Sequence, residues 1–261
     1  MPRFRLTLAY DGRSYAGWQS QPNRNTIQDI TLESLRHFCP AIDGVHGSGR
    51  TDAGVSATGQ IAHFDVSDDW NMDGESWTRA LNSRLPKLIR VLETKQVEPS
   101  FHARFSATAK TYRYDISATD ILDPLRVGLA WHLPKAPPLE DVGAAFRLFE
   151  GCHDFRAFSA KRGDGFDDER ETERTVFEAK SEQIEPGEWR LTITGNGFLY
   201  KMVRFLVGTS IQVARGKIAA NQVETWLRGD DLGSDGPGPF CAPADGLSLV
   251  SVSYEPEKGV N

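Results

Sequence analysis

The sequence predicts an α+β fold built from antiparallel strands and a few helices. Alternation of apolar and polar residues, the pattern of half-buried strands, recurs along the chain. Most neighbouring strand segments lack the intervening helix that a parallel crossover requires. The segments also form two sets that divide near residue 105. We therefore expect an N-terminal α+β half over residues 1–105 and a C-terminal α+β half over residues 106–261.

The first half opens with a strand and a helix. The strand "RFRLTLAY" places four large side chains on one face: Phe4, Leu6, Leu8 and Tyr10. Helical apolar spacing follows from Ile27, and Thr26 with Asp29 three residues later predicts the N-cap. Another alternating strand is expected over 60–66. A short helix is then predicted to start at Ser76 and to end at Pro86.

The second half continues this pattern after a β-rich run over 89–97. The predicted elements are a strand at 110–116, a helix at 137–151, a strand pair at 175–180 and 189–195, a helix at 200–215 and a closing strand at 245–254. The segment Ala160 to Thr175 is charged and punctuated by glycine, which predicts a mobile surface loop.

Composition indicates a globular protein without membrane spans. The chain has 261 residues, of which 39% are hydrophobic and 25% charged. Its apolar runs are too short to cross a membrane, and no signal peptide is expected. Three scattered cysteines favour a reducing cytoplasm over a disulfide framework. The net charge of −6 does not indicate a nucleic-acid partner, although the excess of arginine over lysine suits phosphate oxygens.

Several common site types are excluded by their motifs. The six histidines include no i, i+4 pair and there is no Cys-x-x-Cys, so no metal site is expected. Neither a Walker A loop nor a Rossmann fingerprint is present. Ser48 and Ser56 lack the Gly-x-Ser-x-Gly elbow of serine hydrolases, and the nearby His46 and His63 give only a weak lead.

The stretch "GSGRTDAGVSATGQ", Gly47 to Gln60, admits two interpretations. Asp52, with Arg50 two positions before it, has the properties of a nucleophile or base. Glycines on both sides let the backbone approach a substrate closely. Thr-Asp-Ala-Gly is also ordinary turn chemistry, in which the aspartate caps backbone amides. Taken alone, the loop favours the turn interpretation.

Further stretches change this balance, because together they resemble the tRNA pseudouridine synthase A family. The same glycine-rich loop resembles the catalytic motif of that family. Five other stretches match in the expected order: "LAYDGRSYAGWQSQ", "LNSRLP", "FHARFSATAKTYRY", "GNGFLYKMVRFLVG" and "APADGLSLVSVSY". They extend over most of the chain, from residue 8 to residue 254.

The resemblance implies a function and a set of site residues. Members isomerise uridine to pseudouridine at positions 38, 39 and 40 in the anticodon stem-loop of tRNA, without cofactor or metal. Asp52 is implied to be the catalytic carboxylate and Tyr112 the aromatic residue that stacks on the base. Arg50 is implied to lie beside the flipped-out nucleotide, Arg204 to pair with the aspartate and Leu247 to form part of the pocket wall.

The resemblance also implies two halves whose antiparallel sheets join across a central catalytic cleft. A cytoplasmic homodimer that binds tRNA across both subunits is expected. Two positions depart from the family pattern: Ser56 and Lys201 stand where relatives usually have histidine.

Structural interpretations of the individual residues remain open. Tyr112 also fits strand core, and Arg204 also fits a side chain that reaches from an apolar helix to the surface. Trp18, Gln19 and His102 are given structural roles. The competing functions are a non-catalytic RNA-binding protein and a glycosidase, although the sequence offers no second positioned acid for the latter.

Overall fold

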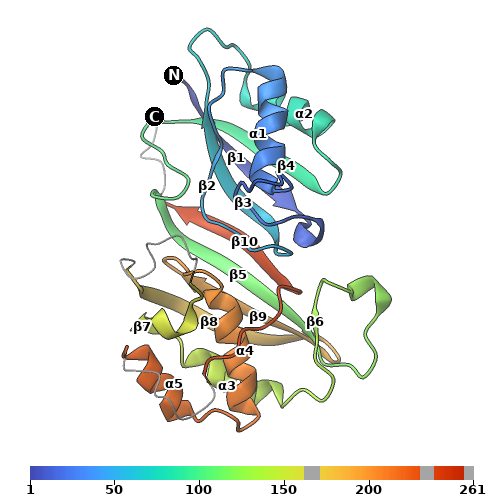
Figure 1. Cartoon of the computed structure of the whole chain (residues 1–261), viewed down its shortest axis with the longest axis vertical. Coiled ribbons are helices and arrows are strands. Elements are labelled where there is room, and N and C mark those ends of the chain that lie inside the picture. Colours follow the sequence, from blue (N-terminus) through green and yellow to red (C-terminus); the bar gives the residue numbers. More distant parts are fainter. Residues whose placement is uncertain (162–170, 230–237, 256–261) are drawn as a thin grey trace. The chain divides into compact units, whose positions relative to one another are not determined.

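The computed structural model describes residues 1–161, 171–229 and 238–255, and the chain clusters into two compact units (Figure 1). The first unit contains Met1–Lys110 and the residues from Ser248 onward. The second unit contains Thr111–Leu247. The expected halves differ from these units mainly in the last strand, which clusters with the first unit because it pairs there.

A mainly antiparallel sheet forms the first unit. Strand β1 (Arg3–Tyr10) pairs antiparallel with β4 (Ile89–Val97) on one side and with β3 (Ser56–Asp65) on the other. The short β2 (His46–Gly47) adds to β3, and β10 (Leu247–Tyr254) runs parallel to β3 at Ser248 and Leu249. β1 buries the four predicted side chains. β3 begins at Ser56, so the glycine-rich stretch already ends in a strand.

Two helices accompany this sheet. Helix α1 (Ile27–Phe38) has the predicted cap, since the Thr26 hydroxyl accepts a hydrogen bond from Asp29 N and donates one to the Asp29 carboxylate. Helix α2 (Gly74–Arg84) contacts β4. The prediction that Ser76 caps it was wrong. Asp73 is the N-cap, and its carboxylate accepts the Ser76 N–H at 2.7 Å, a geometry for which aspartate is as well suited as serine.

In the second unit, antiparallel strands again dominate. The strand order is β5 (Ala107–Ser117), β9 (Glu188–Gly195), β8 (Glu173–Glu185) and β7 (Gly151–Asp154). β6 (Trp131–His132) adds to β5. The predicted strand pair is the hairpin β8–β9, and its tight turn uses Gly187 at a φ of +77°. Together with the first unit, this confirms the α+β class.

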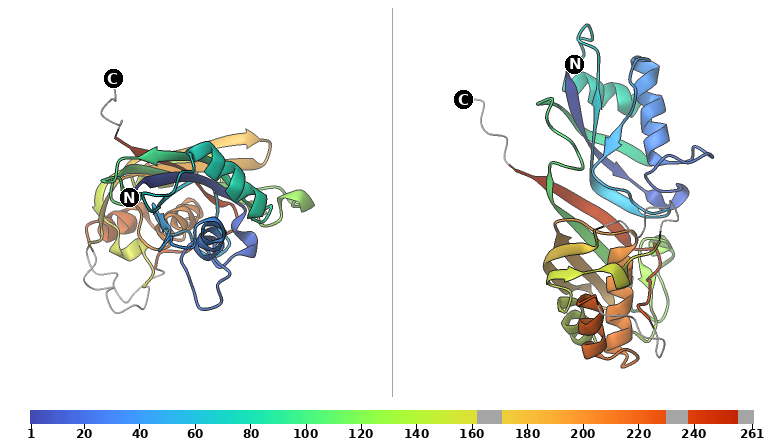
Figure 2. Two further views of the ribbon diagram at one scale, coloured as in Figure 1. Left: turned by 90° about the horizontal axis from the view of Figure 1, so that it is seen from above. Right: turned by 60° about the vertical axis from the view of Figure 1, so that its left-hand side comes forward.

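Three helices accompany the strands of the second unit (Figure 2). α3 (Leu139–Arg147) contacts β8 and α4 (Met202–Ala214), and α5 (Ala220–Leu227) contacts β7. Short 3-10 turns occupy Gly12–Ser14, Pro124–Arg126 and Arg156–Phe158. Sequence patterns did not indicate α5. α4 starts two residues later than predicted, because Lys201 has a left-handed φ of 61°. Residues 162–170 of the predicted loop lie outside the described residues, and its end, from Glu173, is strand.

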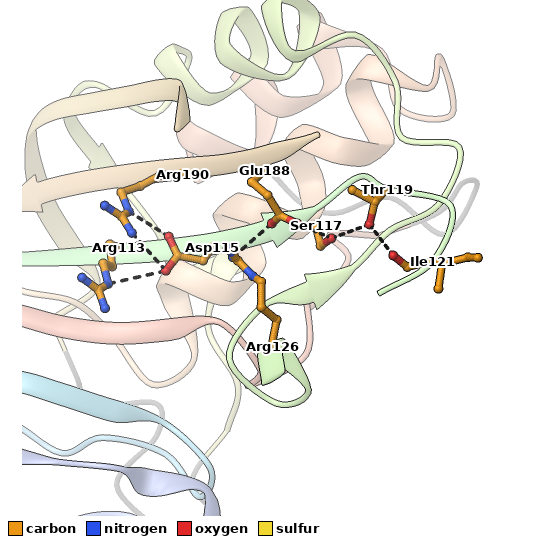
Figure 3. A network of polar contacts seen from close by, with 8 residues as sticks. All are labelled: Arg113, Asp115, Ser117, Thr119, Ile121, Arg126, Glu188 and Arg190. Carbon is orange, nitrogen blue, oxygen red and sulfur yellow. Dashed lines mark hydrogen bonds and ion pairs between the residues drawn. The ribbon is translucent and has the colours of Figure 1, made fainter. Parts of the chain in front are cut away.

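Two carboxylates within the second unit organise a polar network (Figure 3). Asp115, on β5, accepts a hydrogen bond from Arg190 Nε at 2.8 Å and forms an ion pair with Arg113 at 3.6 Å. Glu188, on β9, accepts a hydrogen bond from Ser117 Oγ at 2.8 Å and forms an ion pair with Arg126 at 3.1 Å. Both carboxylates are buried, and burial is tolerable for a charge only when it is paired.

We expect Glu188→Ala to lower the free energy of unfolding by about 2–3 kcal/mol, because Ser117 and Arg126 lose a buried partner. Denaturant unfolding of the purified protein measures the change. Glu185→Ala, at an exposed position on β8, is the matched control and is expected to change stability by less than about 0.5 kcal/mol. Equal effects of the two substitutions would contradict a stabilising role for the network.

Candidate active site

Asp52 lies on the loop between β2 and β3 in the first unit. Its side chain is partly exposed, whereas Thr51 before it is buried. Its carbonyl accepts a hydrogen bond from Val55 N at 3.1 Å, and Gly54 adopts a φ of +83°. The aspartate therefore does sit in a tight turn, as the structural interpretation held. The turn presents its side chain at the surface of a well-anchored loop.

The segment after β1 packs closely on the backbone of this loop. Trp18 N donates a hydrogen bond to Thr51 O at 3.0 Å. Gly17, at a φ of +89°, lies so close that a Cβ there would meet Thr51 O at 2.5 Å and the Asp52 carbonyl carbon at 2.9 Å. Only glycine combines this φ with this approach. Buried Trp18 thus has the structural role expected of it.

Buried polar side chains support the loop from the sheet. Tyr10 Oη and Thr51 Oγ1 are 2.9 Å apart, and Ser48 Oγ donates to Gln60 Oε1 at 2.7 Å. Gln60 Nε2 donates to Gly49 O at 3.1 Å and to Tyr10 Oη at 3.4 Å. Burial raises the pKa of Tyr10 to about 12, against the opposing effect of its hydrogen bonds with Thr51 and Gln60. Tyr10 is therefore a neutral hydroxyl at physiological pH.

Arg50 is held by glutamines. Its Nε donates a hydrogen bond to Gln19 Oε1 at 3.0 Å, and Gln19 Nε2 in turn donates to Gln28 Oε1 at 2.9 Å. Gln19, assigned a structural role from the sequence, thus orients a predicted site residue. The placement of Arg50 beside a flipped-out nucleotide stays a prediction.

Neither serine of the glycine-rich stretch contacts a histidine base. Ser48 Oγ binds Gln60, and Ser56 Oγ accepts a hydrogen bond from Gly12 N at 3.0 Å. Ser56, one of the two departures from the family pattern, thus ties the start of β3 to the turn after β1. A serine-nucleophile arrangement has no support here.

Three histidine rings gather elsewhere in the first unit. The ring centroid of His63 lies 5.2 Å from that of His46 and 4.6 Å from that of His102. Burial first, and then the charge of Arg3, lower the pKa of His63 to about 4, and its Nδ1 accepts a hydrogen bond from Ala103 N at 3.2 Å. His63 is therefore neutral and structural. Among the described residues, no group of histidine, cysteine and acidic side chains is arranged to hold a metal ion.

Tyr112 and its neighbours belong to the second unit. Tyr112 is buried on β5, and its ring packs edge-on against Phe198 with centroids 5.3 Å apart. The adjacent Thr111 hydroxyl lies 2.9 Å from that of Thr194, on β9. The strand-core interpretation therefore holds for the position of Tyr112, and the stacking role remains a prediction.

Arg204 lies in the first turn of α4 and is anchored to the segment before β10. Its Nε donates a hydrogen bond to Ala242 O at 2.8 Å, and Ala242 N donates to Arg204 O at 3.0 Å. Tyr114 Oη donates to Pro243 O at 2.8 Å, which fixes the next residue of that segment. A Cβ on Gly208 would meet Phe240 O at 2.1 Å, so this glycine permits the close approach. Arg204 is held in place rather than extended freely into solvent.

Two positions remain: Leu247, predicted to form part of the pocket wall, and Lys201, which departs from the family pattern. Leu247 is buried at the start of β10, and its N–H donates to Ala244 O at 3.1 Å. Lys201 precedes α4, with its Nζ 5.2 Å from the centre of the Tyr200 ring. The structure thus places Asp52 and Arg50 in one unit and Tyr112, Arg204 and Leu247 in the other.

The sequence did not predict the buried hydrogen bonds of Tyr10, Ser48 and Gln60 that hold the loop of Asp52. Gln60 has the same strand parity as Ala62, Phe64 and Val66, the apolar face predicted for β3. A glutamine on that face was the available signal, because polar side chains are buried only with partners.

No helix among the described residues is long and apolar enough to cross a membrane.

Comparisons with known proteins place this architecture in a family. The family model described as tRNA pseudouridine synthase matches residues 7–106 and 145–255. The tRNA pseudouridine synthase A of Akkermansia muciniphila is 45% identical over 264 residues, covering 98% of this chain and 97% of its own. A relative from Desulfotalea psychrophila is 37% identical and covers 95% of this chain and 98% of its own. A relative from Geobacillus kaustophilus is 38% identical and covers 98% of this chain and 95% of its own. The chain belongs to the tRNA pseudouridine synthase family.

Proposed function

We propose that this enzyme isomerises uridine to pseudouridine at positions 38, 39 and 40 of tRNA, with Asp52 as the catalytic carboxylate. Its family consists of isomerases that act on tRNA. The observation that carries the role of Asp52 is its setting. The carboxylate is partly exposed, on a loop whose backbone is fixed by Gly17, Trp18 and a buried polar layer.

The reaction suits one carboxylate without a cofactor. The N1–C1′ glycosidic bond breaks, the uracil turns, and C5 joins C1′, while the C5 proton leaves and N1 takes up a proton. Substrate and product have the same atoms, so no redox group or second substrate is needed. Asp52 acts either by covalent attack on the substrate or by removing a ribose proton, and both routes require a carboxylate held in a defined position.

The remaining predicted residues hold the substrate. A base must leave its stack before it reacts, at a cost of a few kcal/mol. We assign Tyr112 to stacking on the base, which is worth about 1–3 kcal/mol and tolerates rotation of the ring. Arg50 is assigned to the flipped-out nucleotide, Arg204 to the Asp52 carboxylate and Leu247 to the pocket wall. The anchored guanidinium of Arg204 supports its role, since its position is fixed by Ala242.

We also propose a cytoplasmic homodimer, following the family resemblance.

We expect Asp52→Asn to reduce the rate of isomerisation at least about 10³-fold, because it removes the carboxylate and keeps the side-chain shape. The measurement is tritium release from tRNA labelled at uridine C5, with unchanged tRNA binding as a check on folding. Asp43→Asn, the same change at an exposed position of the first unit, is the control and should retain full activity.

Two outcomes would overturn the proposal. Undiminished release by Asp52→Asn would remove the aspartate from the mechanism. No release by the wild type would favour a non-catalytic RNA-binding protein, and free uracil among the products would indicate a glycosidase instead.

We expect tRNA affinity to fall about ten- to thousand-fold between about 50 and 200 mM salt, because phosphate contacts release counterions. The net charge of −6 requires these contacts to come from a local basic surface. Filter binding with Asp52→Asn measures affinity without turnover. A flat response to salt would contradict binding through the phosphate backbone.

A further inference from the structure

We propose that Gln60 is a positioning residue, whose buried amide holds the loop in the place from which Asp52 acts. The inference rests on the proposed catalytic role of Asp52. It assigns no contact with substrate to Gln60. Its basis is a set of hydrogen bonds that join one side chain to the residues directly preceding the aspartate.

The Gln60 amide bonds two residues of the loop directly and is linked to a third through Tyr10 on β1. Its oxygen accepts the Ser48 hydroxyl at 2.7 Å, and its nitrogen donates to Gly49 O at 3.1 Å. The same nitrogen donates to Tyr10 Oη at 3.4 Å, and that hydroxyl lies 2.9 Å from Thr51 Oγ1. Thr51 adjoins Asp52, so the chain of contacts ends one residue from the carboxylate.

Only an uncharged amide of this length satisfies these partners. The Gly49 carbonyl accepts and cannot donate, which fixes the NH₂ group on that side and the amide oxygen toward Ser48. A carboxylate supplies no donor, and an apolar side chain supplies neither donor nor acceptor. Asparagine is shorter by one methylene. The amide and its partners therefore form a matched set.

Packing alone does not explain this amide. Gln60 is fully buried, and Ala62 and Phe64, two and four positions further along the same face of β3, are apolar and also buried. A buried amide is unfavourable unless every hydrogen bond is made. Here the Gln60 amide bonds Ser48 and Gly49 of the loop that carries Asp52. It also bonds Tyr10, whose hydroxyl contacts Thr51 of the same loop.

The consequence is kinetic. A displacement of about 1 Å at a reacting group is sufficient to reduce a rate by roughly 10²-fold. Freeing Gly49 O and the Tyr10–Thr51 pair lets the loop shift while the strands beneath it remain paired. Loss of Gln60 should therefore lower kcat and leave KM nearly unchanged, since tRNA is bound mainly through its phosphates.

Gln60→Glu tests this role through pH. The ionised carboxyl lacks both donors, so we expect kcat to fall about 10- to 100-fold at pH 8.5. The protonated carboxyl regains a donor for Gly49 O and still accepts from Ser48. The ratio of variant to wild-type kcat should therefore rise again as pH is lowered toward 5.5. Tyr10, which the amide contacts, has a pKa of about 12 and stays neutral over this range. The charged group beside this part of the loop is Lys110, whose Nζ donates a hydrogen bond to Ser48 O at 2.7 Å.

Gln96→Glu, the same change at an exposed position of β4, is the control and should follow the wild-type pH profile. Single-turnover tritium release measures the chemical step, and denaturant unfolding measures stability in parallel. Gln60→Met provides a second variant of similar size without hydrogen bonding. It should show a similar loss of kcat at every pH.

Wild-type kcat in folded Gln60→Met, or a loss in Gln60→Glu that does not vary with pH, would overturn the positioning role. If Gln60→Glu does not fold, Gln60→Met decides. The Asp52→Asn variant separates the two proposals. An active Asp52→Asn contradicts the proposed function itself, whereas an inactive Asp52→Asn with unimpaired Gln60 variants contradicts this inference alone.

Discussion

The close packing of the Thr51–Asp52 backbone on Gly17 is the contact on which this account of the enzyme depends. A Cβ atom at position 17 would lie only 2.5 Å from Thr51 O, so the two backbones meet without room for a side chain. The buried hydrogen bonds of Gln60 and Tyr10 hold the loop from the sheet. Fixing the backbone of one residue costs about 1–2 kcal/mol in conformational entropy. Because the loop backbone is already fixed when the chain folds, the Asp52 carboxylate proposed to react does not have to be ordered again at each turnover.

The same solution recurs in the second unit, where predicted site residues are held by backbone contacts. Arg204 is tied to Ala242, and Gly208 allows the segment from Phe240 to lie against α4. Tyr112 is braced by Phe198. The side chains predicted to form the site thus project from elements whose own geometry is determined by packing, which is how chemically demanding sites keep their geometry. In the proposed isomerisation, the polypeptide has to supply that precision.

The sequence predicted most of the elements because their patterns are local. Alternation identified β1 and most of β3, a β-rich run identified β4, the strand pair β8–β9 was expected, and Thr26 was recognised as a cap. The cap of α2 was misassigned because Asp73 and Ser76 lie within one turn and both residue types favour N-caps. Helix α5 is short, and two-residue strands such as β2 and β6 carry too few residues to show a period. The pairing of β10 with β3 joins distant parts of the chain, which no local pattern reveals.

For the site, the resemblance supplied the candidates Asp52, Arg50, Tyr112, Arg204 and Leu247, and their roles stay predictions. Residue types alone did not single them out. An aspartate between glycines is compatible with both a turn and a catalyst, and here the turn and the proposed catalyst are the same residue. The supporting layer was not predicted, because a buried hydrogen bond depends on which strands become neighbours. Gln60 meets Ser48 and Gly49 only after β2 and β3 have paired.

Conversion of specific uridines of tRNA through the proposed carboxylate of Asp52 leaves pseudouridines that can be mapped in the product. A tRNA transcript with uridines at positions 38, 39 and 40 is incubated with the wild type or with Asp52→Asn, and pseudouridines are located by sequencing after chemical derivatisation. We expect pseudouridine at these positions with the wild type and none with the variant. Modification confined to other positions, or equal modification by both proteins, would contradict it.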